Sequence, residues 1–410
     1  MFLDSYPRKK IGLLIKAIRL QQNLDRKQLS EQVKINQFRL FQIENGQSIL
    51  DEEIIFNLFD ELLIEKDNFG IYDDYINSIF DNYLDNYFFG LKKNNCEIIE
   101  KATHKEINFE NSIYFYRWLL IKYFHGVVQK ETNKEFIELR LVLNKLENDL
   151  EGIELQSYYL CSALEVTRKG GYKESICILN KALAINNEKI LGMVYYHLFI
   201  NYSHINNNDT ASMYLYNALE IFKKSNNFIR ITECILHQGV LATHIKSYDI
   251  AENYFNEAIK LGKMLNLDNI VWRSYHNLSW LKILQKEYTK SYEFTKKSLQ
   301  IKKDPNLYFN AAYILYKQNK NSESLDMMIN SGKALTKRNS VLSEEFRFIE
   351  FARNHTQTEA IEFLYKTLDR IKNKANRDDY LLLLSELLDL LNNQNRLNEI
   401  IIVQKQLMSL

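Results

Sequence analysis

Four segments of the sequence decide the fold: GYKESICILNKAL (171–183), NNDTASMYLYNAL (207–219), SYDIAENYFNEAI (247–259) and EYTKSYEFTKKSL (287–299). They recur every 36 to 40 residues, and each carries small residues at two positions seven apart: Ser175/Ala182, Ala211/Ala218, Ala251/Ala258 and Ser291/Ser298. Positions seven apart lie on one face of a helix, and small side chains there let a neighbouring helix approach closely. The pattern therefore predicts a repeated helix that packs tightly against a partner.

A second regular position lies twelve residues before the first small residue of each copy, at Ala163, Phe199, Gly239 and Ser279. The copies resemble tetratricopeptide (TPR) helix pairs, but the usual repeat is about 34 residues, which implies helices longer by about one turn. Weaker copies follow at Ser324/Ser331, Ala360/Thr367 and Glu399/Gln406. We expect about seven to nine helix pairs across residues 71–410, stacked into a right-handed superhelix with a concave groove.

Composition also favours an all-α fold. The 410 residues include only 12 Gly and 2 Pro, too few for the turns of a β-sandwich or barrel. The formal net charge of +1 gives the surface as a whole no attraction for nucleic acid or anionic membrane. Without a signal-peptide pattern or a run of about 18 apolar residues, we expect a cytoplasmic protein with no membrane partner. Four cysteines without a CxxC pair are expected to be buried and reduced: Cys96, Cys161, Cys177 and Cys234.

The sign of the charge changes near residue 50. Residues 1–50 contain nine Lys or Arg and four acidic residues, a net charge of +5. Residues 51–90 contain eleven acidic residues and one lysine, a net charge of −10, and this stretch includes the segment DNFG at 67–70. We therefore predict a basic N-terminal domain over residues 1–66, a linker at 67–70 and a repeat domain over 71–410.

The N-terminal domain has the apolar spacing of four or five short packed helices. Asp25 and Asn36 are suitable N-cap residues for two short helices joined by a three-residue turn, and Gly46 suits a left-handed C-cap. The stretch GLLIKAIRLQQNLDRKQLSEQVKINQFRLFQIENG (12–46) resembles the XRE-type helix-turn-helix. Lys34 stands where that family has its turn glycine, so this lysine must adopt a left-handed conformation or the turn must differ.

The resemblance implies DNA binding. The second helix of the motif would enter the major groove, where its glutamines could pair with adenine and its arginine with guanine or phosphate. The basic residues that open the preceding helix would contact phosphate. Because one such module contacts too few bases for useful selectivity, DNA binding requires a homodimer that reads two half-sites. The predicted DNA-binding residues are Arg26, Lys27, Gln37, Phe38, Arg39 and Gln42.

Inner-wall positions of tetratricopeptide arrays, transferred by this resemblance, predict a groove with a mixed aromatic and amide wall. Asn277 and Asn310 occupy the same repeat position, where a carboxamide can both donate to and accept from a peptide backbone. Arg273 is a candidate for binding a ligand carboxylate. The predicted peptide-binding residues are Tyr196, His197, His237, Arg273, His276, Asn277, Trp280, Phe309, Asn310 and Tyr313.

The sequence contains no GxGxxG, Walker A, GxSxG or HExxH motif, so we predict no enzyme active site and no cofactor. The pairs His197/His204 and His237/His244 share a seven-residue spacing. They have no cysteine or carboxylate cluster beside them, so we favour a polar groove-lining role over zinc and predict no metal.

A helix-turn-helix followed by a tetratricopeptide array resembles the peptide-pheromone receptor regulators of Gram-positive bacteria, the Rap/Rgg/NprR/PlcR/PrgX (RRNPP) group. The resemblance implies a cytoplasmic, homodimeric quorum-sensing transcriptional regulator that binds double-stranded operator DNA and is switched by a short signalling peptide. Two alternatives stay open. One is an antagonist or phosphatase-like regulator of a response regulator, and the other is a phage or plasmid repressor of the same architecture.

Overall fold

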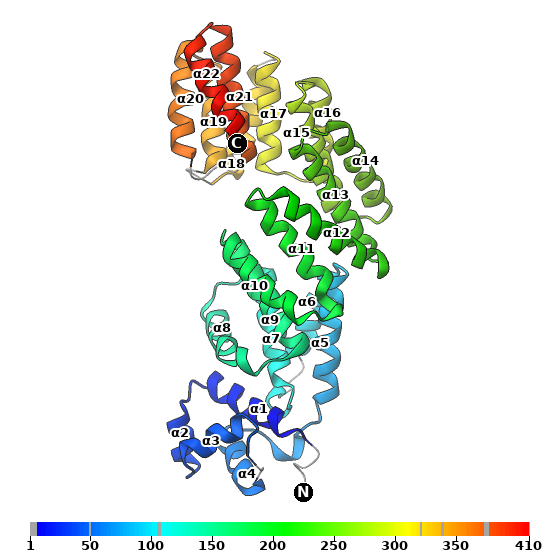
Figure 1. Ribbon diagram of the computed structural model, residues 1–410, viewed down its shortest axis with the longest axis vertical. Coiled ribbons are helices and arrows are strands. Elements are labelled where there is room, and N and C mark those ends of the chain that lie inside the picture. Colours follow the sequence, from blue (N-terminus) through cyan, green and yellow to red (C-terminus); the bar gives the residue numbers. More distant parts are fainter. Residues whose placement is uncertain are drawn as a thin grey trace. The chain divides into compact units, whose positions relative to one another are not determined.

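The computed structural model describes residues 6–48, 51–104, 108–319, 322–337, 340–372 and 377–409. These residues form twenty-two α-helices and three short 3₁₀ helices, with no strand among them (Figure 1). The predicted all-α class is therefore confirmed. The chain divides into two compact units, residues 1–234 and 235–410, and the division falls inside one helix, α13 (Phe228–His244).

The first unit begins with four short helices and continues with longer ones. The short helices are α1 (Arg8–Gln21), α2 (Arg26–Gln32), α3 (Gln37–Glu44) and α4 (Glu52–Glu61). The longer ones are α5 (Asp73–Phe88), α6 (Lys92–His104), α7 (Phe115–Gln129), α8 (Lys134–Leu146), α9 (Gly152–Arg168), α10 (Tyr172–Ile185), α11 (Glu188–His204), α12 (Asn208–Lys224) and the first part of α13.

Helices α1–α4 form the predicted helix-turn-helix module around a small apolar core. Asp25 begins α2 with a capping box, in which its side chain accepts from the Gln28 N–H at 2.7 Å and the Gln28 side chain accepts from the Asp25 N–H at 2.8 Å. Asn36 begins α3 by accepting from the Arg39 N–H at 2.6 Å. Both predicted caps are confirmed, so local sequence chemistry sets where these two helices start.

Three backbone positions fix the geometry of the module. Lys34, between α2 and α3, has φ +58°. This is the left-handed conformation expected if the lysine takes the place of the turn glycine. Gly46 after α3 has φ +66°, as predicted for a C-cap. A Cβ on Gly12 would lie 2.2 Å from the carbonyl oxygen of Ile43, so only glycine lets α1 approach the end of α3 this closely.

The helix-turn-helix module packs within the first unit against the helices that follow it. Lys16 of α1 forms an ion pair with Asp149, which lies just after α8. In the predicted linker 67–70, the Gly70 N–H donates to the Asn111 carbonyl oxygen at 2.8 Å. The segment is thus tied to its surroundings, and its role as a domain boundary stays a prediction.

The small residues that define the repeat lie at the helix seams. All eight are fully buried: Ser175, Ala182, Ala211, Ala218, Ala251, Ala258, Ser291 and Ser298. The serines also use their hydroxyls across the seam, since Ser291 Oγ donates to the Ser279 carbonyl oxygen at 2.8 Å. The predicted close helix packing is confirmed.

The helices and turns of the central repeats have constant lengths. Helices α11, α12, α13, α14 (Tyr248–Met264) and α15 (Asp268–Leu284) each have 17 residues and are separated by three-residue turns, which confirms the predicted extra turn of helix. A residue with φ between +53° and +60° recurs every 20 positions, at Asn186, Asn206, Asn226, Lys246, Asn266 and Lys286. After five of these six, the next N–H closes the turn onto a carbonyl oxygen five residues back, as in a Schellman motif.

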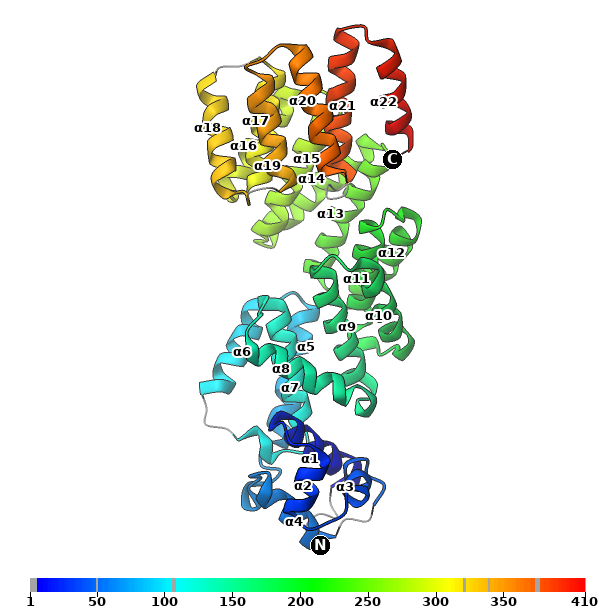
Figure 2. The ribbon, with the colours of Figure 1, turned by 90° about the vertical axis from the view of Figure 1, so that its left-hand side faces the viewer.

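The second unit contains the rest of α13, then α14 and α15, and ends in a helical stack seen side by side in Figure 2. Its remaining helices are α16 (Tyr288–Ile301), α17 (Pro305–Lys317), α18 (Ser322–Leu335), α19 (Val341–Ala352), α20 (Gln357–Ile371), α21 (Arg377–Asn393) and α22 (Leu397–Ser409). Phe346, Leu364, Leu383 and Leu387 are fully buried in one continuous core of this stack. Each helix therefore buries apolar residues against its neighbours, as a repeat array requires.

The cysteines only partly match the expectation. Cys161 and Cys234 are buried, whereas Cys96 and Cys177 are exposed, so the prediction of burial was wrong for these two. All four are free thiols. Cys177 lies on a solvent-facing position of α10, which the repeat pattern alone did not distinguish from a seam position.

Candidate functional site

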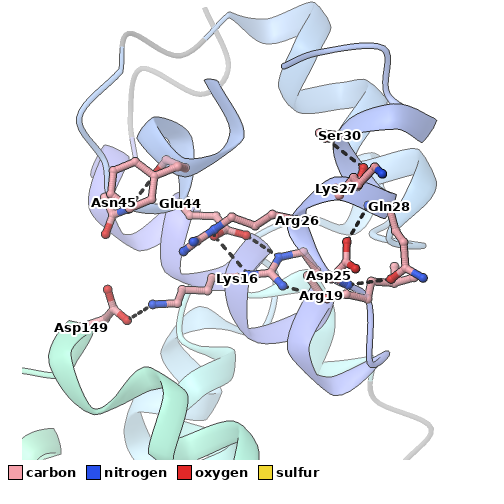
Figure 3. A network of polar contacts seen from close by, with 12 residues as sticks. Lys16, Arg19, Asp25, Arg26, Lys27, Gln28, Ser30, Glu44, Asn45 and Asp149 are labelled. Atoms are coloured by element: carbon pink, nitrogen blue, oxygen red, sulfur yellow. Dashed lines mark hydrogen bonds and ion pairs between the residues drawn. The ribbon is translucent and has the colours of Figure 1, made fainter. Parts of the chain in front are cut away.

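The helix-turn-helix module is held together by a buried ionic cluster centred on Glu44, at the end of α3 (Figure 3). Arg19 of α1 donates to its carboxylate through Nε at 2.5 Å and through Nη2 at 3.2 Å. Arg26 at the start of α2 reaches the same carboxylate at 2.7 Å. The side chains of Glu44 and Arg19 are 0% and 5% exposed, so one carboxylate ties three helices together away from water.

The predicted DNA-binding side chains lie around α2 and α3. Gln37, Phe38 and Lys27 are exposed, with Phe38 at 66%, while Arg39 and Gln42 are half-buried. Phe38 stacks on the ring of Phe41, with the ring centroids 6.4 Å apart, and leaves its outer surface open to solvent. The face therefore presents amide, aromatic and basic groups together, a combination suited to base edges and thymine methyl groups.

Arg26 uses one nitrogen of its guanidinium group for a contact inside the module. Its Nε is bound to Glu44, and its guanidinium lies 5.1 Å from the centre of the Phe41 ring. Its side chain is still 37% exposed. Sequence reasoning missed Glu44 as the residue that orients Arg26, although the acid closing α3 was part of the recognised motif.

In the first unit, the two predicted peptide-binding residues face the interior. Tyr196 is 6% exposed, and His197 Nε2 lies 2.8 Å from the hydroxyl of Tyr87 on α5. Burial, with a smaller contribution from Arg230, lowers the pKa of His197 to about 3. His197 is therefore neutral near pH 7 and serves the contact between α5 and α11.

In the second unit, five of the ten predicted peptide-binding residues meet at one pocket of about 250 Å³. α15 supplies His276, Asn277 and Trp280, α17 supplies Asn306, Phe309 and Asn310, α19 supplies Glu345, and α21 supplies Asp378 and Asp379. Asn277 and Asn310, which share a repeat position, thus line the same pocket, and their role in peptide binding stays a prediction. His237, Arg273 and Tyr313 are not among the residues that line it.

Tyr313 has a different role. It is 4% exposed, and its hydroxyl donates to the Glu386 carboxylate at 2.8 Å. Lys317 Nζ lies 2.7 Å from the same carboxylate and 3.3 Å from that of Asp389. This network ties α17 to α21 inside the repeat stack.

Sequence reasoning missed the acidic side of the pocket. Glu345 and Asp379 come from the C-terminal helices, whose repeat pattern is too weak to give a reliable register. A signal was present, because the acidic pairs Glu344–Glu345 and Asp378–Asp379 are 34 residues apart, one ordinary tetratricopeptide repeat.

Two buried polar atoms at this pocket have no hydrogen-bond partner: Asn310 Nδ2 and Glu345 Oε1. Both residues are 2% exposed. Burial, and next the charge of Asp379, raise the pKa of Glu345 well above its ordinary value. Burial, and next the charge of Asp378, raise the pKa of Asp379 to about 6. The site therefore holds carboxyl groups whose burial disfavours their ionised form.

Other features of the described residues bear on what the chain could bind. Within the ranges that the structure covers, no group of three or more His, Cys, Asp or Glu side chains is placed to hold a metal ion. No described helix combines the length and apolar character needed to cross a bilayer. A larger cavity of about 570 Å³ in the first unit, between the end of α1 and helices α6–α8, contains none of the predicted site residues.

Comparison with known proteins gives a fold relationship. No protein-family model matches the chain, and no curated protein sequence does. Among solved structures, a Rap protein complexed with competence and sporulation factor has a TM-score of 0.66 at 16% identity, over 82% of this chain and 98% of that chain.

Two further solved proteins are similar over the same share of this chain. The quorum sensor NprR from B. thuringiensis, in its apo form, has a TM-score of 0.62 at 17% identity over 98% of its chain, and NprR with its cognate peptide NprX has 0.55. Aspartyl phosphate phosphatase F from Bacillus subtilis has a TM-score of 0.57 at 14% identity over 93% of its chain. The predicted structural resemblance to the peptide-receptor group is confirmed, and the chain has the helical-repeat fold of the Rap and NprR proteins.

Proposed function

We propose that the chain is a cytoplasmic, homodimeric transcriptional regulator that binds operator DNA through α2 and α3 and is switched by a short peptide bound in its repeat domain. The observation that carries the proposal is the joining of two parts in one chain. One part is a capped helix-turn-helix with exposed Gln37 and Phe38, and the other is a repeat array with the fold of known peptide receptors.

The local structure of the motif supports DNA binding. Both helices have side-chain caps, which stabilise the N-terminal turn of α3 that would carry the base contacts. Gln37 in this turn is exposed, and so is Lys27 in the first turn of α2. A second copy of the module on a symmetric dimer would supply the other half-site.

The pocket in the second unit supports peptide binding. It combines the amides of Asn277 and Asn310 with the aromatic side chains of Trp280 and Phe309. Amides can hold a peptide backbone, and aromatic walls can hold its side chains. NprR, which shares the fold, binds the peptide NprX.

A gel shift on the chain's own upstream DNA, with and without synthetic peptides from neighbouring small reading frames, tests both parts. We expect a specific shift, competed by unlabelled upstream DNA but not by random DNA, that one peptide strengthens or weakens. A specific shift that no peptide alters would leave a DNA-binding repressor. Absence of any specific shift at low salt would contradict the proposal.

A second function has one observation in its favour, the likeness to aspartyl phosphate phosphatase F. In this case the repeat domain would bind a response regulator and block it or promote its dephosphorylation. Failure of DNA binding together with co-purification of a response regulator would favour this function. The chain offers no residue that we can assign to a catalytic step.

A further inference from the structure

The acidic pocket of the second unit has features that peptide backbone binding alone does not explain. Three carboxyl groups line it, those of Glu345, Asp378 and Asp379. A backbone-binding wall needs donors and acceptors but has no need for buried charge. Burying a carboxylate is costly unless a cation or hydrogen-bond donors compensate for the lost water.

Arg273, on α15, brings positive charge near the pocket, since its charge adds to burial in lowering the pKa of the lining residue His276. His276 on α15 is neutral, because burial lowers its pKa to about 4. His244 on α13 lies 3.7 Å from Asp378 and is the one basic side chain in ion-pair range of that carboxylate among the described residues. Lys302 near the start of α17 pairs with Asp304, outside the lining.

Two buried polar atoms without a hydrogen-bond partner indicate which groups a ligand of this pocket must carry. Glu345 Oε1 is a buried acceptor without a donor, and Asn310 Nδ2 is a buried donor without an acceptor. Native interiors rarely leave such atoms unsatisfied, and a ligand that pairs both would remove their penalty. That ligand must carry a donor, preferably charged, together with an acceptor such as a carbonyl oxygen.

The size and the lining of the pocket further restrict the kind of ligand that it can bind. A volume of about 250 Å³ holds one residue's side chain or terminus, not a whole peptide. Trp280, which is half-buried, offers aromatic surface that attracts organic cations through its π-electrons, while Phe309 is buried beside it in the wall. A metal ion does not fit these observations, since no described group of ligands is placed for one.

We infer that this pocket binds a positively charged group of the peptide ligand, with Glu345 as its counter-ion and the Asn310 amide donating to a neighbouring carbonyl. Two parts of a peptide carry that chemistry, the amino-terminal ammonium and the side chain of a lysine or arginine. The inference rests on the proposed function for the identity of the ligand as a peptide. The pocket itself is a site for an organic cation beside a carbonyl group.

Three small probes separate these possibilities on the full chain. Nα-acetylarginine N-methylamide carries a cationic side chain, its citrulline counterpart is a neutral molecule of similar shape, and glycine N-methylamide carries only an amino-terminal cation. Binding is followed by the ¹⁵N indole resonance of Trp280, assigned with Trp280→Phe. Trp272, on the same helix but outside the lining, is the internal reference.

We expect at least one cationic probe to shift the Trp280 resonance saturably, at least tenfold more tightly than the citrulline compound. If only glycine N-methylamide gives a saturable shift, the pocket binds the amino terminus of the peptide. If only the arginine compound does so, the pocket binds a basic side chain. Equal binding of the citrulline compound, or no saturable shift with either cation, would overturn the inference.

Variants test the counter-ion directly. Glu345→Gln should weaken cation binding at least tenfold, and Asp378→Asn, at a side chain that is 42% exposed, should weaken it severalfold. Glu362→Gln on the exposed face of α20 removes the same charge and should have no effect. If both pocket variants bind the cation as the unmodified chain does, the assignment of these carboxylates is wrong. Because the gel shift reports on α3, a failed cation test with intact DNA binding rejects this site and leaves the proposed function standing.

Discussion

Arg19 and Glu44 form a two-point ion pair in the interior of the helix-turn-helix module, with Nε to Oε1 at 2.5 Å and Nη2 to Oε2 at 3.2 Å. The pair joins the last turn of α1 to the end of α3. Since Arg26 reaches the same carboxylate, the position of α2 depends on it too. The surface that we assign to DNA is thus supported by an ionic contact beneath it.

Replacement of Arg19 by methionine should destabilise this module, because it removes the main partner of a buried carboxylate. We expect the free energy of unfolding to fall by about 3 kcal/mol, since breaking a buried pair leaves an uncompensated charge. Hydrogen exchange of the α1 and α3 amides would measure it locally. Lys27→Met, which breaks an exposed pair with Glu31, should change stability by less than about 0.5 kcal/mol. Equal protection in Arg19→Met and the unmodified chain would contradict the role of this pair.

Lys34→Gly should stabilise the module. Lys34 has φ +58°, a conformation that is unfavourable for a residue with a Cβ and free of that penalty for glycine. We expect a gain of about 1 kcal/mol, reduced somewhat by the greater entropy of the unfolded glycine chain. Local hydrogen exchange of α2 and α3 would measure the change, and Lys34→Val should lower stability instead. A loss of stability on introducing glycine would mean that the lysine side chain makes a stabilising contact.

The double variant Gln37→Ala with Arg39→Ala tests the DNA face. Each lost base contact should cost about 1 to 3 kcal/mol, so specific operator affinity should fall at least a hundredfold while binding to random DNA falls much less. Titrated gel shifts and circular dichroism would report affinity and helicity. Gln357→Ala with Lys366→Ala, two exposed positions on α20, removes the same charge and should leave binding unchanged. Undiminished specific binding would remove α3 from the interface.

Asn277→Ala with Asn310→Ala tests the peptide wall. Truncating two amides that pair with a ligand backbone should weaken peptide affinity by about 1 to 3 kcal/mol for each group left unpaired. Isothermal titration calorimetry with the peptide identified in the gel shift would measure this. Asn393→Ala, exposed on α21 outside this pocket, is a matched control. Unchanged affinity in the double variant would mean that the peptide lies elsewhere in the array.

The acidic pocket should make the second unit less stable as the pH rises. The pKa of Asp379 is raised to about 6 in the folded chain, above its value when unfolded, so the folded state binds the proton more tightly. The resulting contribution of Asp379 to the free energy of unfolding is fully present below about pH 4 and is lost as the pH rises through about 6. Glu345, Asp378 and His276 line the same pocket, and His244 lies 3.7 Å from Asp378.

Thermal unfolding at pH 5 and pH 7.5 measures the effect. Between pH 5 and pH 7.5, the free energy of unfolding should fall by about 1 to 3 kcal/mol more for the unmodified chain than for Asp379→Asn, because the asparagine has no proton to release. Glu362→Gln should behave like the unmodified chain. If Asp379→Asn shows the same pH dependence as the unmodified chain, the raised pKa is not a property of this carboxyl group.

The sequence predicted the parts of this protein that depend on local chemistry. Asp25, Asn36 and Gly46 set helix ends through their own side chains or backbone, and the buried seam residues repeat often enough to reveal the packing. The contacts of His197 with Tyr87 and of Tyr313 with Glu386 join residues 110 and 73 positions apart. Such pairs depend on how helices stack, and a repeat register places a residue on a helix face without naming its partner.

The turns of the central repeats have a consequence for how this chain can change over evolution. From Asn186 to Lys286, every left-handed residue is followed by the next 20 positions later. Loss of a single residue from a helix would rotate everything beyond it by about 100° and turn its buried face outward. Within α11–α15, where the helices share one length of 17 residues, a change in chain length is therefore expected to come in whole helix pairs of about 40 residues, whereas the 14-residue helices α10 and α16 mark where this constraint ends.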